Sequence, residues 1–130
     1  MSLVRLTVDR DYQIPAGEPD LCGYVVSTDT GDRIGDVRDA VADATAMKVR
    51  YLILSIDKEF IHERYDRQVI VPLDLFGIDK AAGMVVCATC NAPSLARFPT
   101  ISAETLPADI EERIRAVRVA EGLESERRAA

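Results

Sequence analysis

The middle of the chain alternates between short apolar runs and breaks made of glycine, proline or charged residues. The most apolar run, Val49–Ile56, would place large apolar groups on both faces of a strand. One face would line a core, and a packed helix or a partner subunit would cover the other. We expect further strands at Cys22–Ser27, Arg33–Ala44, Gln68–Leu73 and Gly83–Ala88, and a short strand or irregular segment at Leu3–Thr7. The pattern predicts a mainly β fold, a small barrel of short antiparallel strands.

Glycine, proline and charge mark the connections between these strands. Gly31 suits the positive backbone angle of a hairpin turn between the first two strands. Gly35 predicts a bulge or bend where a small barrel turns a corner. The charged segment Asp57–Arg67 predicts a long, loop-like hairpin connection. Pro93 and Pro99 predict an irregular closing segment with room for a single helical turn.

A C-terminal helix is expected over residues 106–122. Pro107 suits the first turn, and acidic residues precede arginines, which complements the helix dipole. Apolar residues at helical spacing form one narrow stripe: Leu106, Ile110, Ile114 and Val117. The stripe favours docking of the helix on the barrel, with a contact to another chain as the alternative. The sequence thus divides into a lead-in (1–20), the barrel (21–101), a C-terminal helix region (102–124) and a disordered tail (125–130).

The composition narrows the classes of protein to consider. The 130 residues suffice for one domain with a core, and 48% are apolar, which excludes a disordered chain. The sequence shows neither a transmembrane run nor an apolar signal segment, so a cytoplasmic location is expected. The net charge of −6 and the absence of Trp argue against direct nucleic-acid binding. Three cysteines fit a reducing compartment better than a disulfide scaffold.

The stretch Gly23–Asp79 contains the motifs GYVV, DTG, IGDV, VRYLI and VIVPL in this order. The glycine-turned hairpin, the strand with recurring acids, the R-Y-L strand and the V-P strand resemble the PRC-barrel family. That family includes the cytoplasmic domain of the photosynthetic reaction centre H subunit and the C-terminal domain of the ribosome maturation factor RimM. The resemblance covers most of residues 11–100. It implies a small, stand-alone bacterial or archaeal protein, without catalytic activity.

Cys87 and Cys90 form a C-x-x-C pair, a spacing found in zinc sites and in redox dithiols. Zinc needs about four ligands, and only Cys22 and His62 remain as sulfur or nitrogen donors, without supporting spacing. A redox pair needs its first cysteine at a helix N-terminus, whereas this pair follows a strand. We therefore expect unliganded, partly buried thiols, with metal binding and redox activity as alternatives.

Two further groups of polar residues are candidates for a catalytic or metal-binding site. His62 is the only histidine and lies among acidic residues, but the sequence offers no catalytic partner motif, so we expect a plain loop histidine and no catalytic residues. The acids Asp36, Asp39 and Asp43 recur along one strand and could bind a divalent cation. Turn-forming and edge-strand roles explain them more simply. No cofactor and no metal are expected.

These features favour a non-enzymatic interaction or scaffold module that is homodimeric and binds an unidentified protein partner, without inserting into a membrane. One alternative is a ribosome- or RNA-processing-associated factor by analogy with RimM, and another is a photosynthesis-linked assembly factor. A thiol or metal-binding protein that uses Cys87 and Cys90 is the third. The residues expected at an interface are Tyr51, Ile53, Ile110, Ile114 and Val117.

Overall fold

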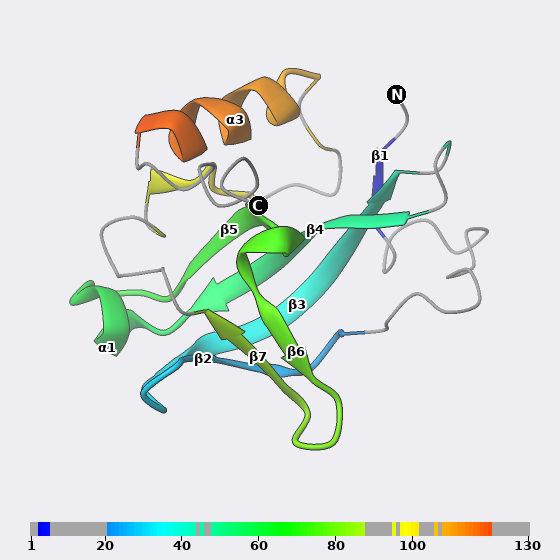
Figure 1. The fold of residues 1–130 in the computed structure, drawn as a ribbon. Coiled ribbons are helices and arrows are strands. Elements are labelled where there is room, and N and C mark those ends of the chain that lie inside the picture. Colours follow the sequence, from blue (N-terminus) through cyan, green and yellow to red (C-terminus); the bar gives the residue numbers. More distant parts are fainter. Residues whose placement is uncertain are drawn as a thin grey trace.

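The computed structural model describes residues 3–5, 21–43, 45, 48–87, 95, 97–101, 106 and 108–120. They form a mainly β fold with one seven-stranded sheet and a C-terminal helix, as predicted (Figure 1). The strands are β1 (Leu3–Arg5), β2 (Val25–Thr28), β3 (Arg33–Asp43), β4 (Lys48–Ile56), β5 (Arg67–Pro72), β6 (Gly77–Asp79) and β7 (Met84–Cys87). The helices are α1 (Lys58–Ile61), the 3₁₀ turn η1 (Leu73–Leu75) and α3 (Ile110–Ala120).

The sheet has the strand order β5-β4-β3-β2-β7-β6, and β1 pairs with β3. Most neighbours are antiparallel, as predicted, but β2 and β7 run parallel. Parallel neighbours need a long connection, and the strands β3 to β6 supply it here. Among the described residues β5 and β6 do not pair with each other, so the sheet does not close into a full barrel.

The long strand β3 crosses the sheet and bends as it does so (Figure 1). Its register shifts twice against β4 and once against β2, next to Gly35. A Cβ on Gly35 would overlap the backbone carbonyl oxygen of Ser55 on β4, so only glycine permits this close approach. The predicted bulge at Gly35 is therefore confirmed.

Several boundaries differ from the expectations. The charged connection Asp57–Arg67 contains the one-turn helix α1, where a loop was expected. The Asp66 side chain supports this turn, since its Oδ1 accepts a hydrogen bond from the Lys58 N–H at 2.8 Å. Helix α3 begins at Ile110, later than residue 106. Strand β6 was not predicted, because its three exposed residues include one large apolar side chain, Ile78, and show no strand pattern.

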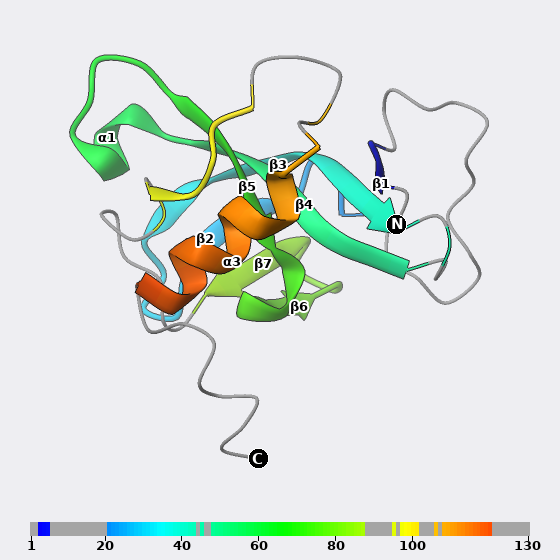
Figure 2. The ribbon, with the colours of Figure 1, turned by 90° about the horizontal axis from the view of Figure 1, so that it is seen from above.

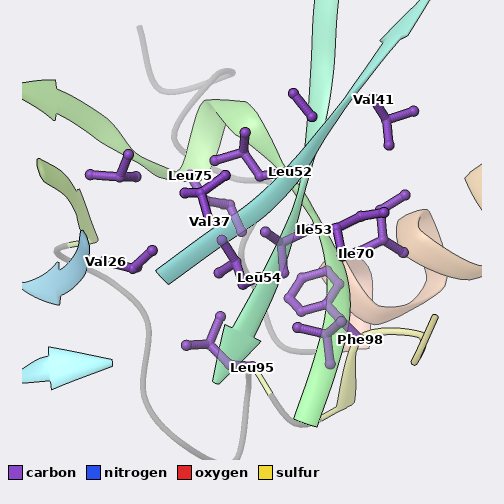
Figure 3. Packing of buried hydrophobic residues seen from close by; sticks show 14 of the residues in the cluster. Val26, Val37, Val41, Leu52, Ile53, Leu54, Ile70, Leu75, Leu95 and Phe98 are labelled. Carbon is purple, nitrogen blue, oxygen red and sulfur yellow. The ribbon is translucent and has the colours of Figure 1, made fainter. Parts of the chain in front are cut away.

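The core lies between the sheet and α3, which packs against β5 (Figures 1 and 2). Figure 3 shows Leu52, Ile53 and Leu54 of β4 among the other buried side chains, including Phe98. These three consecutive β4 residues are fully buried, so both faces of the strand are covered by the chain itself. This confirms the expectation that β4 is covered on both sides, and it accounts for the cover without a partner subunit.

Some expectations fall on residues that the structure does not describe. They concern the lead-in between residues 6 and 20, the part of the closing segment next to Pro93 and the tail at 125–130. Leu95 and Arg97, farther along that closing segment, are helical, in agreement with the expected turn. The short strand expected at Leu3–Thr7 is present as β1 over Leu3–Arg5.

Candidate functional site

The state of Cys87 differs from the one expected from the sequence. Cys87 ends β7, is buried, and is disulfide-bonded, so it is not the unliganded thiol expected from the sequence. Cys90 lies outside the described residues. Cys22 is exposed and precedes β2, whose far end, Thr28, pairs with Cys87. Cys22 lies in a turn closed by the hydrogen bond from the Tyr24 N–H to the Leu21 carbonyl, at the opposite end of β2 from Cys87.

His62 lies on the charged connection after β4. It is exposed and ends α1 in the left-handed conformation, with φ of 55°. The acids near it have other partners: Glu63 pairs with Arg67 at 2.6 Å, and Asp66 accepts from the Lys58 backbone. In the part of the chain that the structure describes, no three His, Cys, Asp or Glu residues gather as metal ligands.

The acids of β3 are not edge-strand residues, which corrects the sequence interpretation. Strand β3 is internal, and Asp39 is fully buried, with its Oδ2 2.7 Å from Nε of Arg5 on β1. Asp43 is also buried and accepts a hydrogen bond from the Thr45 backbone. The ion pair between Arg5 and Asp39 therefore links β1 to β3. Sequence reasoning missed it because the partners are distant along the chain.

The expected interface residues are mostly part of the chain's own core. Ile53, Ile110 and Ile114 are buried, while Tyr51 and Val117 are half-buried. The docking of α3 on the sheet, the favoured interpretation of its stripe, is confirmed. Because Ile53, Ile110 and Ile114 are buried, they are not accessible to a partner on the surface of the folded chain.

Two polar contacts join α3 to the rest of the fold, one from Tyr51 of β4 and one from Asp74 of η1. The Tyr51 hydroxyl donates to Glu111 at 3.3 Å, and Arg118 Nη1 lies 2.9 Å from Asp74 Oδ1. Burial raises the pKa of Tyr51, and the nearby Glu111 carboxylate raises it further. The raised pKa keeps the hydroxyl protonated, and able to donate, to a higher pH than for an exposed tyrosine.

The two edges of the sheet differ in their cover. Residues 99–101 lie along the outer edge of β5: the Ile70 N–H donates to the Pro99 carbonyl at 3.0 Å, and Ile101 donates to Gln68 at 3.1 Å. A bridge also joins Val69 to Thr100. Strand β6 is exposed along its whole length and pairs with β7 alone among the described residues. Its outer edge is thus a set of backbone groups open to another strand.

A groove of about 440 Å³ lies between the beginning of β4, η1 and the last turn of α3. Its polar and aromatic lining consists of Lys48, Arg50, Tyr51, Asp74, Phe76 and Arg118. Sequence reasoning missed this groove because three separate elements form it.

The comparisons with known proteins agree with these structural features. A model of the PRC-barrel domain matches residues 19–89, more than half of the chain. The chain belongs to the PRC-barrel family. The match contains β2 to β7, including the open edge, and ends before α3. No curated protein matches the chain significantly. Of the helices that the structure describes, none has the length and apolar character to cross a membrane.

Proposed function

We propose that this PRC-barrel protein is a non-enzymatic interaction scaffold that forms a homodimer through the outer edge of β6. The observation that supports the proposal is the contrast between the covered edge of β5 and the exposed edge at Gly77–Asp79. An exposed strand edge offers unpaired N–H and C=O groups, which pair readily with another strand.

A second copy of β6 is a suitable partner for this edge. Antiparallel pairing of two identical strands follows twofold symmetry, the commonest symmetry of soluble oligomers. A pairing centred on Ile78 would place the two Ile78 side chains near the symmetry axis. Ile78 is 38% exposed, one of three large apolar residues so exposed among those described, so its burial adds to the backbone hydrogen bonds.

The test is sedimentation equilibrium of the wild type and of Ile78→Lys at micromolar to high micromolar concentration. Lysine on an edge strand opposes pairing, so Ile78→Lys is expected to be monomeric while the wild type forms dimers. Val119→Lys is the matched control, because Val119 is a similarly apolar, exposed residue on α3. A monomeric wild type, or equal weakening by both variants, would contradict the proposal.

A further inference from the structure

We propose that the groove between β4, η1 and α3 binds an acidic peptide segment of a partner protein. This function is separate from self-association through β6. The groove has the size of a ligand site, for which volumes of about 300–1,000 Å³ are typical. It therefore accommodates a short stretch of chain with a few side chains.

The charge of the groove is opposite to that of the protein. Lys48, Arg50 and Arg118 line it, with Asp74 as the single acidic residue among the lining residues. The chain as a whole has a net charge of −6. A local positive potential on an acidic protein attracts a short acidic segment and does not favour a long polyanion, which would meet the acidic remainder of the surface.

Two of the cations have donors to spare. Lys48 is exposed, and its ammonium group has no ion pair with the described residues. Arg50 is also exposed, and its Nε lies 3.8 Å from Asp43, longer than the 2.7 Å between Arg5 and Asp39. A guanidinium has five donors in a fork that matches a carboxylate. Arg50 therefore retains the capacity to bind a second carboxylate.

Arg118 contributes a donor that no described residue satisfies. Its Nη1 donates to Asp74 at 2.9 Å, while its Nε is buried without a hydrogen-bond partner in the described structure. Buried donors are nearly always paired in native proteins, and an unpaired one is destabilising. A modest shift of the side chain toward a bound carboxylate would supply the missing acceptor.

The aromatic walls favour a peptide over a small free anion. Tyr51 and Phe76 are half-buried and line the same groove as the cations. The Tyr51 hydroxyl is fixed by its bond to Glu111, so the ring is held in place. Aliphatic side chains of a peptide can pack on these rings while neighbouring carboxylates bind Lys48 and Arg50.

The test is a fluorescence anisotropy titration of the full chain with a short fluorescein-labelled peptide of alternating Glu and Leu. Alternating Gln/Leu and Lys/Leu peptides are the comparison ligands. We expect the Glu/Leu peptide to bind at least about tenfold more tightly than either, with an affinity that falls as salt rises. The double variant Lys48→Glu/Arg50→Glu is expected to lose at least about tenfold in affinity, because it reverses both accessible cations.

The matched control is Arg64→Glu/Lys80→Glu, which reverses two exposed cations outside the groove. Each change from Lys or Arg to Glu adds −2, so both double variants go from −6 to −10, and long-range repulsion is the same. Equal weakening in the two double variants would overturn the proposal. Complete displacement of the Glu/Leu peptide by inorganic phosphate, at a phosphate concentration equal to that of the peptide carboxylates, would also overturn it. Tighter binding of the Lys/Leu peptide would do the same. The same peptide titrations are repeated with the Ile78→Lys substitution present in each protein. Because that substitution is expected to prevent dimerisation through β6, the result does not depend on the dimer.

Discussion

The two edge strands of this sheet, β5 and β6, differ in how far the rest of the chain covers them. The β5 edge is closed by backbone hydrogen bonds to residues 99–101 and is overlaid by α3. Among the described residues, none covers the β6 edge in this way, and all three residues of β6 are exposed. Both edges belong to one sheet, so the difference cannot come from strand pairing alone. It comes from which edge the later part of the chain returns to cover.

We expect the covered side of the sheet to determine the stability of the fold and the exposed β6 side to determine association. On the covered side, buried side chains of β3, β4, β5 and α3 join one core, and substitutions there should lower the free energy of unfolding. On the β6 side, few apolar contacts are at stake, so substitutions should alter association more than folding.

The largest loss of stability is expected for Gly35→Ala. The new Cβ would overlap the Ser55 carbonyl oxygen, and because that atom is backbone, β3 and β4 must separate. We expect a loss of about 3 kcal/mol or more by urea denaturation. Gly77→Ala on β6 is the control: its Cβ would meet the Val86 carbonyl oxygen at 3.9 Å, an ordinary contact. A similar loss in both variants would break the proposed difference between the two sides.

Arg5→Met tests the buried ion pair that fastens β1 to β3. It leaves the fully buried Asp39 carboxylate without its 2.7 Å partner, and removing one member of a buried pair costs about 3 kcal/mol. Arg33→Met removes an exposed arginine that lies 2.8 Å from Asp57, where about 0–1 kcal/mol is expected. The two losses are compared by urea denaturation at the same pH. An equal loss would mean that the buried pair contributes no more than an exposed one.

Tyr51→Phe should cost about 1 kcal/mol at neutral pH, because it removes the hydrogen bond to Glu111 between sheet and helix. The raised pKa of Tyr51 fixes the pH dependence. Its stabilising effect is fully present below the unfolded-state pKa of about 10 and is lost as pH rises through the higher folded-state pKa. The difference between wild type and Tyr51→Phe in unfolding free energy should therefore shrink as the pH rises above about 10. A constant difference over that range would contradict the assignment.

The smallest effect on stability is expected for Ile78→Lys, within about 0.5 kcal/mol for a dissociated chain at low concentration. Its exposed side chain leaves the core unchanged. Thermal unfolding of dilute wild type and variant measures this directly. A loss of several kcal/mol would show that β6 belongs to the stabilising part of the sheet.

The sequence predicted the elements whose pattern is local. The apolar run of β4 predicts a strand, and the apolar stripe of α3 predicts a helix. Gly35 predicts the bulge in β3. The DTG and IGDV motifs led to the correct family, which the domain match confirms. What these signals have in common is that neighbouring residues suffice to read them.

The remaining features depend on long-range placement. The short strand β6 gains its conformation from pairing with β7, so its own three residues show no strand pattern. The role of Asp39 depends on Arg5, and the groove depends on three elements that meet only in the fold. The disulfide at Cys87 was also missed, because sequence spacing alone does not distinguish a thiol from a disulfide.

The most direct test of the account is hydrogen exchange of individual amides, measured by NMR on the wild type over a range of protein concentrations. The account predicts that the Ile70 amide, which already donates to Pro99, exchanges slowly at every concentration. Exchange within Gly77–Asp79 should slow as concentration rises, because dimerisation would cover the β6 edge. Exchange in β6 that does not change with concentration, while sedimentation shows dimers, would place the interface elsewhere and contradict the central claim.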